Sequence, residues 1–177
     1  MNAQNQVILC VDDEEANIKL LEKILTPRGY TVVTAERGDD ALLIIKSQAI
    51  DLVLLDILMP GMDGFEVCRQ IKEDQKLRSI PVIIVTSLSA KQDRIRGIEA
   101  GAEEFLSKPF DPTDVLARIK LLLKVKKLNE DLYRAEETVQ KTHDDFECLV
   151  QERTAELAQA NEMLQAEILR LTLQARV

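Results

Sequence analysis

The stretch ILCVDDEEAN, residues 8–17, places four acidic side chains directly after an apolar segment with the composition of a β-strand. Carboxylates crowded in this way repel one another, and each is costly to remove from water. A chain that sets them at the end of a buried strand needs another group to compensate their charge. The rest of the sequence indicates the fold that brings them there and the nature of that group.

Composition restricts the class of protein. The chain has 177 residues, of which 46% are hydrophobic and 31% charged, so it can form an ordinary core. Its net charge of −8 argues against direct nucleic-acid binding, which needs a basic surface. No apolar run approaches the roughly 20 residues of a membrane span, and the N-terminus lacks a signal peptide's features. Three scattered cysteines favour reduced thiols, two of them in the core, in a cytoplasmic protein.

Apolar segments alternate with helical patterns over the first part of the chain. Three of these segments are almost continuously apolar, which is typical of strands covered on both faces in a parallel sheet. Repeated strand–helix units predict an α/β fold, here an open, doubly wound, five-stranded parallel sheet. The predicted strands are residues 7–11, 31–35, 51–56, 81–87 and 103–107.

The composition changes after Pro112, because all five prolines and all six glycines lie at or before it. Apolar residues then recur alternately three and four apart, from Val125 to Phe146 and again from Val150 to Leu171, which is heptad spacing. The phase shifts between the two runs, as in a stutter that unwinds a supercoil locally. A lone helix of this length needs a partner. The sequence thus predicts an α/β domain over residues 1–124 and a coiled-coil helix over residues 125–177.

The ends of the predicted strands carry polar groups of one chemical kind. Open α/β sheets bind ligands at the carboxyl ends of their strands, and these ends carry Asp12, Asp13, Asp56, Thr86 and Lys108. Packed carboxylates are the hard oxygen donors that Mg²⁺ prefers, and the ion would remove their mutual repulsion. A hydroxyl and an ammonium group beside such an ion suit a phosphoryl group. The strand ends therefore predict a cation site that takes a phosphate.

Four segments carry a wider pattern: VDDE at 11–14, LLDILMPGMDG at 54–64, VTS at 85–87 and AGAEEFLSKPF at 100–110. Through them, residues 5–124 resemble the receiver domain of two-component response regulators, whose fold is flavodoxin-like. The resemblance implies that Asp56 is the phosphoacceptor, that Thr86 bonds a phosphoryl oxygen and that Lys108 pairs with it. The implied Mg²⁺ ligands are Asp12, Asp13, Asp56 and the backbone carbonyl of Leu58.

The resemblance also implies a switch. In the family, the threonine moves towards the phosphoryl group and an aromatic side chain turns inward behind it, and Phe105 occupies that aromatic position. Because Phe105 lacks a hydroxyl, we expect it to act through packing. Apolar Leu58 cannot orient an attacking water, so we expect slow autodephosphorylation. A cis peptide before Pro109, frequent in the family, would aim Lys108 inward.

The segment QERTAEL, residues 151–157, resembles the signalling helices of bacterial signalling proteins through Glu152, Arg153 and Thr154. We therefore expect a parallel homodimer, joined by the coiled coil, that a cognate histidine kinase or phosphotransfer protein phosphorylates in a phosphorelay. A passive dimerising stalk is the alternative for this segment. No output domain is recognisable and the heptad pattern reaches the end of the chain, so we expect a fragment whose output domain is missing or separate.

Three other functions are alternatives to a phosphoacceptor domain. A Mg²⁺-dependent phosphatase with an aspartyl nucleophile would carry a second aspartate two residues after Asp56, where this chain has Leu58. A nucleotide-binding domain would need glycines after the first strand, and residues 12–28 contain none. A dimerising scaffold with an inert receiver also stays open, although every position that the chemistry needs is filled.

Overall fold

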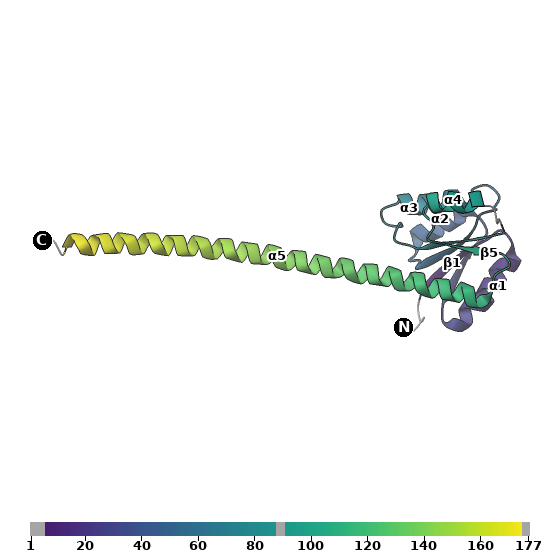
Figure 1. Ribbon diagram of the computed structural model, residues 1–177, viewed down its shortest axis with the longest axis horizontal. Helices are drawn as coiled ribbons and strands as arrows, with labels where there is room; N and C mark the ends of the chain where they lie inside the picture. The colour runs from purple at the N-terminus through teal and green to yellow at the C-terminus, as the bar shows by residue number, and fades with distance from the viewer. Residues whose placement is uncertain (1–5, 88–90, 175–177) are drawn as a thin grey trace. The chain divides into compact units, whose positions relative to one another are not determined.

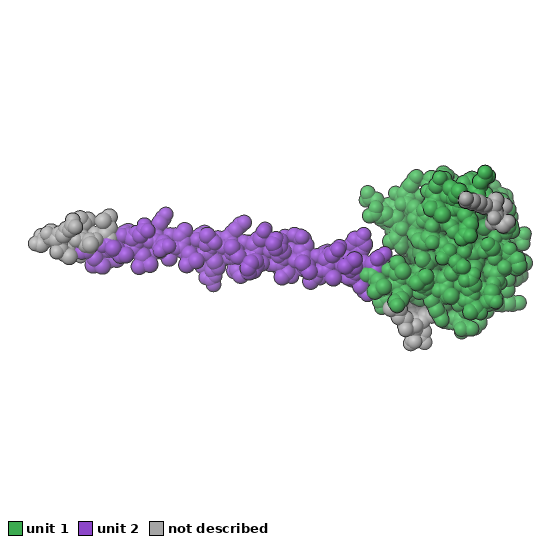
Figure 2. Space-filling model, in the orientation of Figure 1, with its two compact units in different colours: residues 1–128 green, residues 129–177 purple. Residues whose placement is uncertain are grey.

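The computed structural model describes residues 6–87 and 91–174. The chain divides into two compact units, residues 1–128 and 129–177, which Figure 2 shows in different colours. The boundary after Lys124 that the sequence suggests stays a prediction. Each unit is described by itself below.

Unit 1 contains one parallel five-stranded sheet with strand order β2-β1-β3-β4-β5. Leu9 of the strand β1 lies opposite Val33 on one side and Val53 on the other, so β1 pairs with two neighbours. The predicted fold class is confirmed, and the first two strands begin and end where the sequence places them. The strands are β1 Val7–Val11, β2 Thr31–Ala35, β3 Leu52–Asp56, β4 Val82–Thr86 and β5 Glu104–Ser107.

Helices lie on both faces of this sheet, as Figure 1 shows. Side chains alternate between the faces of a strand, and β3 illustrates the result. Val53 and Leu55 pack in the core under α2 and α3, whereas Leu52 and Leu54 pack in the core under α1 and the first part of α5. The helices are α1 Glu15–Leu25, α2 Gly38–Ser47, α3 Gly64–Glu73, α4 Lys91–Glu99 and α5 Pro112–Gln174, with a short 3₁₀ helix η1 at Thr26–Arg28.

The last helix, α5, begins with a side-chain cap. The backbone N–H of Thr113 donates to Asp111 Oδ1 at 2.6 Å, and Pro112 occupies the first helical position, where its missing N–H costs nothing. Lys126 then ties the helix to the amino edge of the sheet, because its Nζ lies 2.9 Å from Asp51 Oδ1 and 3.4 Å from the Ile50 carbonyl oxygen. α5 extends to Gln174, which confirms the predicted long final helix.

Unit 2 consists of the remainder of that helix. Every side chain that the structure describes between residues 129 and 171 is exposed, including the large apolar ones. The exposed apolar residues that lie on the predicted heptad positions of this unit are Leu132, Val139, Phe146, Val150, Leu157, Leu164, Ile168 and Leu171. None of the helices in the described ranges is long and apolar enough to cross a membrane.

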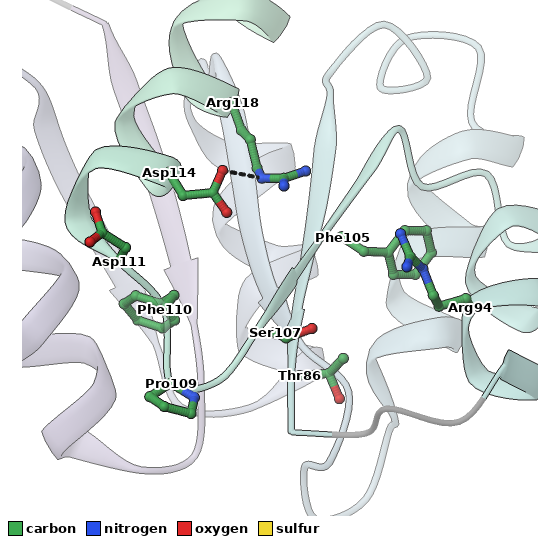
Figure 3. A pocket seen from close by; sticks show the side chains of 9 residues that line it. All are labelled: Thr86, Arg94, Phe105, Ser107, Pro109, Phe110, Asp111, Asp114 and Arg118. Carbon is green, nitrogen blue, oxygen red and sulfur yellow. Dashed lines mark hydrogen bonds and ion pairs between the residues drawn. The ribbon is translucent and has the colours of Figure 1, made fainter.

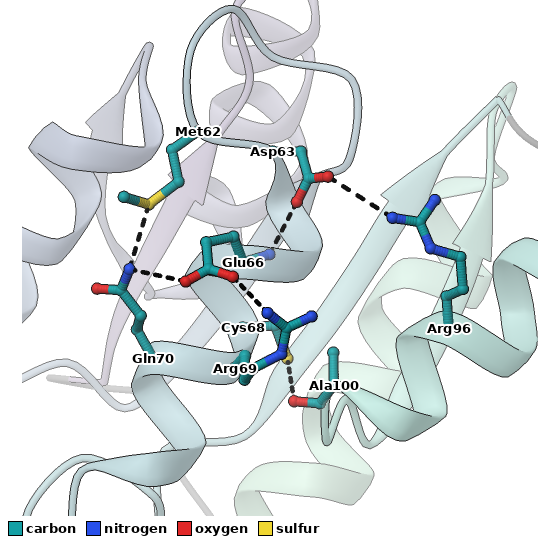
Figure 4. Close-up of polar contacts among 8 residues, drawn as sticks. All are labelled: Met62, Asp63, Glu66, Cys68, Arg69, Gln70, Arg96 and Ala100. Carbon is teal, nitrogen blue, oxygen red and sulfur yellow. Dashed lines mark hydrogen bonds and ion pairs between the residues drawn. The ribbon is translucent and has the colours of Figure 1, made fainter.

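The three cysteines fall into two kinds of environment. Cys10 and Cys68 are buried, which confirms the expectation of two core thiols, and Cys148 is exposed. Burial raises the pKa of the Cys68 thiol to about 11, and burial likewise raises the pKa of Cys10. The Cys68 thiol donates to the carbonyl oxygen of Ala100 at 3.4 Å (Figure 4). Both core thiols are therefore neutral at physiological pH.

Candidate functional site

The strand order places a binding crevice at the carboxyl ends of β1 and β3. Within the sheet, β2 is the neighbour of β1 on one side and β3 is its neighbour on the other, so the strand order reverses between β1 and β3. Such a reversal opens a crevice between the loops that follow the two strands. Asp12 and Asp13 follow β1 directly, and Asp56 is the last residue of β3.

The three carboxylates predicted from the sequence meet at this crevice. One oxygen from each of Asp12, Asp13 and Asp56 lies within 4.8 Å of the others. Asp12 and Asp56 are buried, and Asp13 is exposed. The donor set consists of hard oxygens alone, with one ligand open to solvent, and this suits Mg²⁺, which keeps several waters when bound. The residues present therefore fit the predicted cation.

Lys108 supplies the compensating charge. Its Nζ lies 2.7 Å from Asp12 Oδ2 and 3.1 Å from Asp56 Oδ1, so one ammonium group contacts two of the three carboxylates. The backbone N–H of Lys108 donates to the Thr86 carbonyl oxygen at 2.8 Å, which fixes the loop after β5 to the end of β4. The peptide bond from Lys108 to Pro109 is cis, as expected.

Burial and the contacts between Lys108 and the carboxylates shift the pKa values of the site in opposite directions. Burial raises the pKa of the Asp56 carboxyl, and the positive charge of Lys108 only partly offsets the effect. Burial alone would lower the pKa of Lys108, but the hydrogen bond to Asp12 and the charge of Asp56 raise it on balance. Lys108 therefore stays protonated beside the carboxylates at physiological pH.

Asn17 is a site residue that the sequence reasoning missed. Its Nδ2 donates to Asp12 Oδ1 at 2.9 Å, and the backbone N–H of Glu14 donates to the same oxygen at 3.0 Å. These two donors, with Lys108 on Oδ2, hold Asp12 in one orientation. The only signal in the sequence is an amide at the end of the acidic stretch, and it does not reveal which way the side chain turns.

The loop after Asp56 packs closely against the site. A Cβ atom at Gly64 would overlap the Asp56 carbonyl oxygen, so only glycine allows this approach. Asp63 caps α3, because its Oδ1 accepts from the N–H of Glu66 at 2.8 Å, and its Oδ2 lies 3.8 Å from Arg96 Nη2 of α4 (Figure 4). The loop is thereby attached to α3 and α4. Leu58 lies in this loop with an exposed side chain, and the metal role of its carbonyl stays a prediction.

Thr86 and Phe105 lie on the neighbouring strands β4 and β5. Both line an open pocket of about 420 Å³ beside α4 and the start of α5, shown in Figure 3. Thr86 is buried as the last residue of β4, and Phe105 is half-buried on β5. The described structure therefore gathers Asp12, Asp13, Asp56 and Lys108 in direct contact or near contact, with Thr86 and Phe105 bordering a shared pocket.

Replacement of Lys108 tests the charge balance. In Lys108→Met, Asp12 and Asp56 lose the ammonium group that contacts both of them, so we expect the free energy of unfolding without Mg²⁺ to fall by about 1–3 kcal/mol. Denaturant unfolding at neutral pH measures it.

Lys126→Met is the matched control, because Lys126 is 14% exposed against 18% for Lys108 and pairs with the half-exposed Asp51. We expect a loss below about 1 kcal/mol there. Equal losses in the two variants would contradict the prediction.

Comparisons with known proteins agree with this geometry. Residues 8–120 match the family described as the response regulator receiver domain. The chain is 46% identical over 129 residues to response regulator PleD of Caulobacter vibrioides, a match that spans 73% of this chain and 28% of PleD. The chain spans between 28% and 51% of the length of several curated relatives that it matches, which are longer proteins.

Solved structures give the same result. The receiver domain of a signal transduction histidine kinase from Syntrophus aciditrophicus is 36% identical, with a TM-score of 0.65, and the match covers 68% of this chain and 91% of that one. The BeF₃-activated receiver domain of DrrB is 35% identical, with a TM-score of 0.60, over 67% and 97% of the two chains. The fold, the crevice and these matches together show that the chain belongs to the response regulator receiver domain family.

Proposed function

We propose that residues 1–124 form the phosphoacceptor domain of a response regulator, and that residues 125–177 pass its signal on as a dimeric coiled coil. A histidine kinase or phosphotransfer protein would phosphorylate Asp56. The observation that carries this proposal is the charge cluster, in which three carboxylates lie within 4.8 Å and Lys108 Nζ contacts Asp12 and Asp56. Asp12 and Asp56 of this cluster are buried, and buried charged groups with specific charge partners are concentrated at functional sites.

The proposed reaction is a phosphoryl transfer. An oxygen of Asp56 attacks the phosphorus of a phosphohistidine, the new O–P bond forms as the P–N bond breaks, and the imidazole nitrogen of the donor leaves. Asp12, Asp13, Asp56 and the carbonyl of Leu58 would hold Mg²⁺, which when bound neutralises the carboxylates and the phosphoryl oxygens.

The other site residues would bind the phosphoryl group once it is attached to Asp56. Lys108 would pair with a phosphoryl oxygen, and the Thr86 hydroxyl would donate to another. Phe105 would follow Thr86 by packing into the space beside it, since both border the same pocket. Asp56 keeps the phosphoryl group, so the chain acts as a phosphoacceptor rather than as an enzyme with turnover.

The exposed apolar residues of unit 2 support the dimer. A monomeric helix that exposes such a regular apolar stripe would be only marginally stable in water, and pairing with a second copy would bury the stripe. The inert scaffold remains the alternative, and it shares the dimer but not the phosphorylation. The two functions are therefore separated by tests at Asp56.

Phosphorylation is tested by intact mass. After incubation with Mg²⁺ and a small-molecule phosphodonor such as acetyl phosphate, we expect the wild-type chain to gain one phosphoryl group and Asp56→Asn to gain none. Asp51→Asn is a second control, because it changes an aspartate at the opposite edge of the sheet. An unmodified wild-type chain with Mg²⁺ bound would favour the inert scaffold.

The lifetime of the acyl phosphate tests the role of Leu58. The exposed apolar side chain cannot orient an attacking water, so we expect the phosphorylated mass to persist for minutes or longer after the donor is removed. Leu58→Asn should shorten that lifetime, because an amide can hydrogen-bond water. A wild-type lifetime of seconds would contradict the prediction.

Dimerisation is tested on the helix surface. Leu164→Asp places a charge on the predicted heptad stripe, so we expect the dissociation constant from sedimentation equilibrium to rise at least about tenfold. Met163→Asp is the matched control, because Met163 is a neighbouring exposed apolar residue outside the stripe. If Met163→Asp weakened a dimer as strongly as Leu164→Asp, the stripe would not be the interface.

A further inference from the structure

The helix α4 differs from the other helices of unit 1 in how it is attached. Gly97 is the only buried residue among its described side-chain positions, 92–99, and Ile95 and Ile98 are 45% and 64% exposed. By contrast, α3 buries Phe65, Val67, Cys68 and Ile71. A helix that brings no large apolar side chain into the core loses most of the stabilisation that packing supplies. Other contacts must therefore hold α4.

The first contact is a close approach of the helix backbone to Phe105. A Cβ atom at Gly97 would lie 2.5 Å from Cε1 and Cζ of the Phe105 ring and 3.0 Å from Cδ1 of Ile84. Ile84 and Phe105 are directly paired in the sheet, so their side chains form one surface beneath the helix. The glycine is needed for space, because any side chain there would displace the ring or the helix.

Two arginines supply the remaining described contacts with aromatic rings. Arg94 Cζ lies 5.8 Å from the centroid of the Phe105 ring, within the range of a cation–π interaction (Figure 3). Arg96 Cζ lies 4.4 Å from the centroid of Phe65 on α3, and its Nη2 lies 3.8 Å from Asp63 Oδ2. Arg96 thus joins α4 to α3, whereas Arg94 joins it to Phe105.

We propose that Gly97 and Arg94 are positioning residues for Phe105: the ring lies beneath Gly97 and against the guanidinium group of Arg94, and these two contacts hold it in its resting position. The proposal rests on the switch role of Phe105 in the proposed function. If the ring moves towards Thr86, it leaves the space beneath Gly97 and the guanidinium of Arg94 together. α4, which has no large buried side chain among residues 92–99, would then lose the contacts of Gly97 and Arg94 with the ring and keep those of Arg96 with Phe65 and Asp63.

The test uses NMR of the full chain with phenylalanine labelled by ¹³C on the ring, which gives signals from only four residues. Phe105→Leu assigns the relevant signal. Mg²⁺ with beryllofluoride, a mimic of the phosphoryl group, should shift the Phe105 signal in the wild type and leave it in place in Asp56→Asn. Intact mass after acetyl phosphate treatment reports phosphorylation separately.

In Arg94→Met, we expect the resting Phe105 signal to lie closer to its beryllofluoride-bound position. Loss of the cation–π contact should change the ratio of the two ring positions by about two- to fivefold. Arg94→Lys should bring the resting Phe105 signal part of the way back to its wild-type position, because lysine keeps the positive charge. Gly97→Ala should displace the resting signal further in the same direction and shrink the response to beryllofluoride.

Arg96→Met is the matched control, since it removes the other arginine–aromatic contact of the same helix. It should change the Phe65 signal and leave the resting signal and the response of Phe105 as in the wild type. If Arg94→Met and Gly97→Ala both leave the Phe105 signal unchanged, including when they lower stability, the inference is wrong and the proposed function stands. If Asp56 is phosphorylated and the wild-type Phe105 signal does not respond, the switch role of Phe105 fails, and the inference fails with it.

Discussion

The contact of the Lys108 ammonium group with Asp12 and Asp56 is the interaction on which the site depends. The carboxyl ends of parallel strands lie along one edge of the sheet, and here Asp12 directly follows β1 and Asp56 ends β3. Lys108 lies 96 residues beyond Asp12 in the chain and directly after the edge strand β5, yet its side chain reaches back to β1. The loop after the last strand is thus tied to the first strand through the charges that need compensation.

A second lysine makes a similar contact at the amino ends of the strands. Lys126 pairs with Asp51, whose other carboxylate oxygen accepts from the backbone N–H of Val7 at the start of β1. α5 begins just after Lys108 and reaches Lys126 some four turns later, so one helix connects the carboxyl edge of the sheet with the amino edge. Both ends of this part of α5 are held by charged contacts, and Val115 and Ile119 between them are buried in the core.

The sequence predicted the sheet and the acidic cluster well because both follow from local patterns. Continuous apolar runs mark strands covered on both faces, and polar residues at their ends must meet at one edge. Asn17, Arg94 and Lys126 could not be predicted in this way, because helical positions outside the core carry the same residue types whether or not they touch another element. Gly97 is a further case: its meaning depends on the ring beneath it, which lies on a strand that comes later in the chain.

The distribution of the thiols has a practical consequence. Cys10 and Cys68 are enclosed in the core and Cys148 is exposed on the long helix, so a thiol-directed fluorophore or spin label would attach to the native chain at a single position. Because Cys148 lies in unit 2, a distance measured between two such labels would report on whether two copies pair along their helices, as we propose. The unaltered protein thus carries its own reporter site in unit 2, whereas the carboxylate cluster belongs to unit 1.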